Sequence, residues 1–139
     1  MSAAHVAALR REVQRMPRAS RAAMARAVRD PASVGLDGIT AGKFVSGSGD
    51  HWCGCPTVAL ALALGLVMLD DIKAHGGFTA ALADAAPPEA LDCALGATRC
   101  ERWLPGCFDH LAAEVGTGEA VRVLLDLLEP PKEVADVRG

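Results

Sequence analysis

Aromatic residues are scarce in this chain of 139 residues. Tyrosine is absent, and only three phenylalanines and two tryptophans occur. Because β-strands favour aromatic and β-branched side chains, this scarcity argues against a fold built from sheets. It also argues against a platform of aromatic rings on which the bases of single-stranded nucleic acid could stack.

Long hydrophobic runs are also lacking. The apolar stretch at residues 58–69 has twelve residues, well short of the roughly 20 that a transmembrane helix needs. Residues 1–30 are charged and contain no continuous apolar segment of the kind found in secretory signals. We therefore expect neither export nor a membrane partner.

Cysteine is present, but its five copies follow no repeated spacing. Without an export signal, we expect a cytoplasmic protein with mostly free thiols, because the cytosol keeps thiols reduced. Hydrophobic residues make up 51% of the chain and charged residues 22%, which is typical of a globular protein. The length predicts one helical domain at residues 1–131, followed by a loose C-terminal tail at 132–139.

Apolar residues recur at spacings of three and four along most of the chain, which is the periodicity of helices. With the breaks at proline and glycine, they predict helices at residues 3–16, 20–29, 56–75, 78–85, 88–103, 107–115 and 117–128. We expect Ser20 and Thr117 to cap two of them. The predicted fold class is all-α, a compact bundle of five to seven short helices.

The helix at residues 56–75 is the expected centre of this bundle. Pro56 suits a first helical turn, Gly76 suits a helix end, and residues 58–69 are apolar on every side. Gly65, in the middle, predicts that another helix crosses close to it. The glycine-rich residues 33–55 predict a long loop, with a short strand at 43–46.

Positive charge is concentrated at the N-terminus. Residues 1–30 carry seven arginines and two acidic residues, a net charge of +5, whereas the whole chain has −3. The arginines take the outer positions of the first two predicted helices, so we expect a basic helical hairpin docked on the domain. One interpretation is a solvated basic face. Another is weak binding of nucleic acid, with Arg11, Arg15 and Arg18 as the contact residues.

Cysteine and histidine residues form two clusters in the sequence. Cys53 and Cys55 stand at the start of the central helix, where free backbone N–H groups favour a thiolate. A structural zinc site would need four sulfur or nitrogen ligands. The candidate ligands are Cys53, Cys55, Cys100, Cys107, His51 and His110. Alternatively, Cys53 and Cys55 form a redox pair, or Cys93, Cys100 and Cys107 are simply small buried residues.

No catalytic signature stands out in the sequence, so we expect a protein without catalysis. The first hypothesis is a small helical module that acts by binding or assembly, with an unidentified protein or a second copy of itself as the partner. The second is a structural zinc or thiol-redox protein that uses the loop carrying Cys53 and Cys55. The third is weak nucleic-acid binding by the N-terminal arginines.

Overall fold

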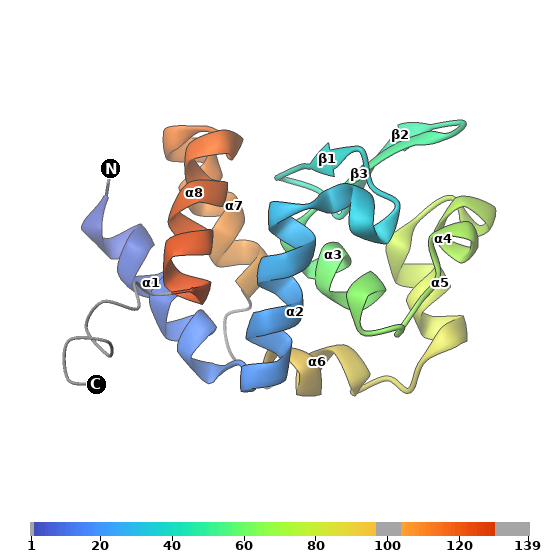
Figure 1. The fold of residues 1–139 in the computed structure, drawn as a ribbon, viewed down its shortest axis with the longest axis horizontal. Helices are drawn as coiled ribbons and strands as arrows, with labels where there is room; N and C mark the ends of the chain where they lie inside the picture. The colour runs from blue at the N-terminus through green and yellow to red at the C-terminus, as the bar shows by residue number, and fades with distance from the viewer. Residues whose placement is uncertain (1, 97–103, 130–139) are drawn as a thin grey trace.

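The computed structural model describes residues 2–96 and 104–129. Within these ranges the chain forms eight α-helices, one short 3-10 helix and a small three-stranded sheet (Figure 1). The helices are α1 (Ala3–Arg15), α2 (Arg18–Arg29), α3 (Pro56–Ala63), α4 (Leu69–His75), α5 (Phe78–Ala85), α6 (Ala90–Leu95), α7 (Leu104–Val115) and α8 (Thr117–Leu128). The predicted all-α fold class is confirmed.

The first two helices do not pack chiefly on each other, as a hairpin would. Instead α1 packs on α7 and α8, whereas α2 packs on α3 and α8 (Figure 1). The reason lies in α2, which buries residues on several sides, including Ala23, Met24 and Val28. A helix with so many small and apolar residues can serve two neighbours, so α2 lies inside the bundle with its arginines at one edge.

Two predicted helix caps are wrong. The second helix begins at Arg18 behind Pro17, and Ser20 lies buried within its first turn. Pro17 occupies the cap position, and no described side chain caps this helix. The last helix is preceded by Gly116 in the cap position, and Thr117 is its first residue.

The predicted central helix is split in two. Helix α3 ends at Ala63 and α4 begins at Leu69, so one continuous helix over 56–75 is wrong. Gly65 takes a left-handed conformation, with φ of 72°. The N–H of Leu66 donates to the carbonyl of Ala61 at 3.0 Å, and the N–H of Gly65 donates to that of Leu62 at 3.2 Å. This pair of bonds is the Schellman helix ending.

Gly65 therefore terminates a helix and does not make room for one that crosses. A methyl group placed on Gly65 would meet no atom within 4 Å, which contradicts the predicted close crossing. The split buries α3 from Pro56 to Ala61 while α4 turns away to pack on α5. Gly76 ends α4 as predicted, again in the left-handed region with φ of 72°.

The glycine-rich segment holds a 3-10 helix (Pro31–Val34) and the sheet, whose strands are β1 (Gly38–Ile39), β2 (Val45–Ser48) and β3 (His51–Gly54). Strand β3 lies in the middle, parallel to β1 and antiparallel to β2. The predicted strand at 43–46 is therefore present, two residues further along. Gly47 faces Trp52 across the hairpin, and a methyl group on Gly47 would lie 2.2 Å from the carbonyl oxygen of His51.

One apolar core joins the helices. Its largest fully buried side chains include Phe108, Leu9, Met24, Leu60 and Ile72, which come from five different helices. None of the described helices is long and apolar enough to cross a bilayer. The predicted helix over 88–103 is wrong in its end, because α6 stops at Leu95 and Gly96 takes a left-handed conformation with φ of 66°. Residues 97–103, the sequence end of the predicted domain and the predicted tail at 132–139 fall outside the described residues.

Candidate functional site

The two neighbouring cysteines occupy different environments. Cys53 is half-buried in β3, in register with Gly38 of β1 and Ser46 of β2. Cys55 follows the strand and takes the N-cap position of α3, where it is 3% exposed. Both are free thiols in the structure, as is Cys93.

Burial dominates the chemistry of Cys55. It raises the pKa of this thiol to about 11, although the backbone N–H groups of Val58 and Thr57 donate hydrogen bonds to the sulfur and act in the opposite direction. The negative charge of Asp109 on α7 adds to the increase. The prediction that the start of α3 favours a thiolate is therefore wrong for Cys55, because the free N–H groups do not replace the lost hydration of a buried anion.

The remaining predicted zinc ligands are spread over the molecule. His51 is 90% exposed at its side chain, with Nδ1 3.5 Å from Oδ2 of Asp37. His110 is exposed on α7, and its ring centroid lies 6.0 Å from that of His5 on α1. Cys107 is buried on α7, and Cys100 falls outside the described residues.

Metal ligands do not gather in the part of the chain that the structure describes. Over residues 2–96 and 104–129, no three side chains of histidine, cysteine, aspartate or glutamate are placed so that they could hold one metal ion. Zinc binding that includes Cys100 stays a prediction. The alternative of small buried cysteines holds for Cys107, whereas Cys93 is exposed on the short helix α6.

The N-terminal arginines differ in whether they have an acidic partner. Arg15 pairs with the buried Glu12 at 3.6 Å, and Arg29 pairs with Glu129 at the end of α8. The other five make no ion pair with any residue in the described ranges; they are Arg10, Arg11, Arg18, Arg21 and Arg26. An arginine without a carboxylate keeps its full charge available to an external anion.

Three of these free arginines line one groove between α2 and α8. This arginine groove has a volume of about 370 Å³ and is lined by Arg18, Arg21, Ala22, Arg26, Leu128 and Glu129. Figure 1 shows α8 lying against α2, with the C-terminal end of α8 near the two N-terminal helices. Ala22 and Leu128 form the apolar part of this lining.

A second groove continues on the other side of Arg21. It has a volume of about 290 Å³ and is lined by Arg10, Val13, Gln14, Arg21, Asp126 and Leu127. Residues of α1, α2 and α8 meet there, because α8 packs on both N-terminal helices. Arg21 belongs to the lining of both grooves.

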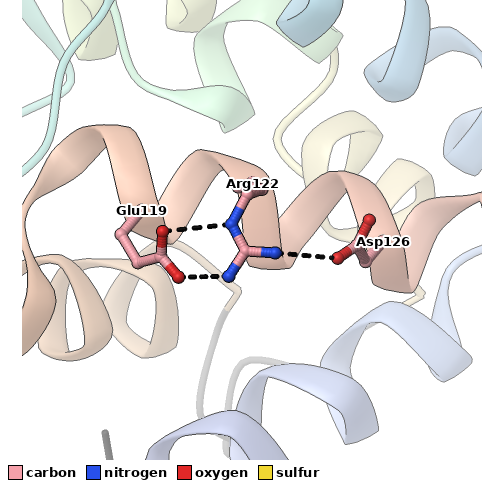
Figure 2. Close-up of polar contacts among 3 residues, drawn as sticks. All are labelled: Glu119, Arg122 and Asp126. Atoms are coloured by element: carbon pink, nitrogen blue, oxygen red, sulfur yellow. Dashed lines mark hydrogen bonds and ion pairs between the residues drawn. The ribbon is translucent and has the colours of Figure 1, made fainter.

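The two carboxylates in these linings already have cationic partners. On α8, Arg122 lies between Glu119 and Asp126 and donates hydrogen bonds to both (Figure 2). The bond from its Nη1 to Oδ2 of Asp126 measures 3.5 Å. The other carboxylate is Glu129, which pairs with Arg29. The carboxylates that line the grooves therefore do not pair with the arginines that line them.

One of the three predicted nucleic-acid contact residues lies in the arginine groove, and nucleic-acid binding by these residues stays a prediction. Arg18 lines the arginine groove, whereas Arg11 and Arg15 are exposed on α1 and line neither groove. Sequence reasoning missed Arg21 and Arg26. Their spacing from Arg18, three and eight residues along a helix, was a usable signal for a common side. The wall from α8 had no signal in the sequence, because it comes from about 100 residues further along the chain.

No protein-family model matches the chain, and no curated protein or solved structure matches it either. A function for the chain must therefore be inferred from the contacts, burial and charges of its own residues.

Proposed function

We propose that the protein is a non-catalytic binding module that takes an anionic partner in the arginine groove. The observation that carries this proposal is the set of three arginines around one groove without an acidic partner. Like charges held close together destabilise a fold unless a counter-charge is bound. A bound anion relieves that repulsion, so the same arrangement that costs stability in the free protein supplies affinity for a ligand.

The chemistry of the groove suits phosphate or carboxylate groups. Arginine presents a planar set of donors that matches both groups, and such charge-assisted bonds are about twice as strong as neutral ones. The three cationic residues that line the groove are all arginines, so each of them can bind in this way. The groove contains no arrangement of nucleophile and base that would favour catalysis instead.

Titration calorimetry with tripolyphosphate at low ionic strength tests the proposal. The double substitution Arg18→Gln with Arg26→Gln is expected to weaken binding by at least about tenfold, because two charge-assisted contacts are lost. Arg11→Gln is the matched control, since Arg11 is also exposed and unpaired but lies outside both grooves. We expect the control to change affinity by less than about twofold.

Equal losses in the two variants would show that the general charge of the N-terminal segment binds the anion, which contradicts a site in the groove. Absence of binding at low salt would overturn the proposal as a whole. Both substituted positions are exposed at their side chains, so the fold should be retained. Far-UV circular dichroism checks that it is.

Self-association is a second candidate, supported by the turn between α3 and α4. Leu64 is 38% exposed and Met68 64% exposed, and these are the exposed large hydrophobic residues of the described ranges. We propose a second copy of this chain as the partner of this turn. Met68→Ser should then weaken self-association in sedimentation equilibrium, whereas Ala74→Ser, at an exposed position of α4, should not. A protein that is monomeric at all concentrations would refute the candidate.

The cytoplasm is the location that we propose for this binding. The sequence predicts mostly free thiols, and Cys53, Cys55 and Cys93 are free in the described structure. Thiols persist in a reducing compartment, which supports the proposal. A fusion to a fluorescent protein, followed in cell fractions, tests it.

A further inference from the structure

The two grooves described above share one residue, Arg21, which lies in α2 between them. Arg21 is half-buried, and its Nε is covered from water without a hydrogen-bond partner in the described structure. A cation that is partly removed from water and not paired is costly. Negative charge placed in either groove would offset this cost, so Arg21 is a natural anchor for a ligand that occupies both.

The spacing of the arginines favours a long ligand over a compact one. Arg18 and Arg26 are eight residues apart, or about 12 Å along the helix axis. Arg10 lies on α1 and lines the second groove. One phosphate group cannot reach all of these positions. A chain with a negative charge at regular intervals can contact each of them in turn.

The side chains of the two grooves favour a phosphate backbone over exposed bases. The linings contain arginine, glutamine, small and aliphatic residues and two carboxylates, and no aromatic ring. Base stacking therefore has no platform, and guanidinium groups contact phosphate oxygens without reading sequence.

We propose that the arginine groove and the second groove together bind one phosphodiester strand through its backbone, with Arg21 as the central contact. The proposal rests on the proposed anion binding and specifies its ligand. Four free arginines take part: Arg10, Arg18, Arg21 and Arg26. Because each neutralised phosphate of a single strand contributes about −0.7 to the slope of log affinity against log salt, we expect a slope of about −3.

Fluorescence anisotropy with labelled oligothymidylates of about 4 and about 12 nucleotides tests the proposal. Arg10→Gln should weaken binding of the longer strand by about tenfold and make the salt slope less steep by about 0.7, while it leaves the shorter strand unchanged. Arg21→Gln should weaken both strands, because Arg21 serves both grooves. Arg11→Gln is the charge-matched control and should weaken neither. Circular dichroism confirms that each variant is folded.

Four outcomes separate this inference from the proposed function. The expected pattern, with oligoadenylate of the same length bound within about threefold, supports a backbone contact. If Arg10→Gln and Arg11→Gln act alike, the second groove takes no part and the inference fails. If a glutamate decapeptide binds as tightly as the longer strand, the ligand is any polyanion, which overturns the phosphodiester assignment and leaves the proposed function intact. If tripolyphosphate and both strands fail to bind, the two proposals fail together.

Discussion

Gly96 is the position at which we expect one added methyl group to be most destabilising. It ends α6 in the left-handed region with φ of 66°. A Cβ atom at this position would lie 1.9 Å from the carbonyl oxygen of Arg15 and 2.7 Å from its carbonyl carbon. The end of α6 therefore lies directly against the last turn of α1, and only a residue without a side chain fits between the two backbones.

The size of the effect follows from two contributions. A left-handed conformation costs an alanine about 1 kcal/mol. The overlap with backbone atoms forces the two helix ends apart, which costs about 2 kcal/mol more by analogy with overpacked cores. We expect Gly96→Ala to lower the free energy of unfolding by about 3 kcal/mol. For a domain of this size, that corresponds to a fall in Tm of about 10 °C.

Gly65→Ala is the matched control, because Gly65 has a similar φ of 72° and no atom near the added methyl group. It should lose about 1 kcal/mol, the cost of the left-handed conformation alone. Urea unfolding followed by circular dichroism measures both variants, and equal m-values would show that the unfolding transitions are comparable. Equal losses of stability in the two variants would refute the close approach of α6 to α1.

Three further predictions concern thiols, pH and the core. At pH 8 about one Cys55 thiol in a thousand is ionised, given its pKa of about 11. A thiol reagent should therefore modify the exposed Cys93 first and Cys55 only on unfolding. A fast phase of thiol modification that the substitution Cys55→Ser removes would contradict this expectation. Both ring nitrogens of His75 face acceptors, the carbonyl of Asp71 at 2.8 Å and the carboxylate of Asp84 at 2.6 Å, and these contacts raise its pKa above 6.5. Its contribution to stability is thus complete below pH 6.5 and is lost as the pH rises through the raised pKa; an NMR titration should show the higher pKa in the native protein and a lower one in Asp84→Asn. Phe108→Ala should cost about 3 to 5 kcal/mol in urea unfolding, since Phe108 is fully buried, and a loss below about 1 kcal/mol would contradict the described core.

Which segments form helices, and which residues are apolar enough for a core, could be predicted from the sequence alone. The periodic spacing of apolar residues identified α1, α5 and α8 nearly to their ends, and Gly76 identified the end of α4. These features depend on interactions between residues three or four apart, so local sequence is sufficient to specify them. The scarcity of aromatic residues likewise predicted the small extent of the sheet.

The tertiary structure decided everything that depends on distant neighbours. Gly65 could either allow a helix to cross or end one, and the structure shows that it ends α3 in a left-handed conformation with no other described helix near it. Burial under the chain reversed the expected ionisation of Cys55, although the helix start favours a thiolate locally. The grooves exist because α8 packs on both α1 and α2 while its carboxylates are occupied by Arg122 and Arg29. Periodicity sets which face of a helix is apolar, but it does not set which helix covers that face. The helix that packs there also brings its own charged residues, and these determine which arginines have an acidic partner.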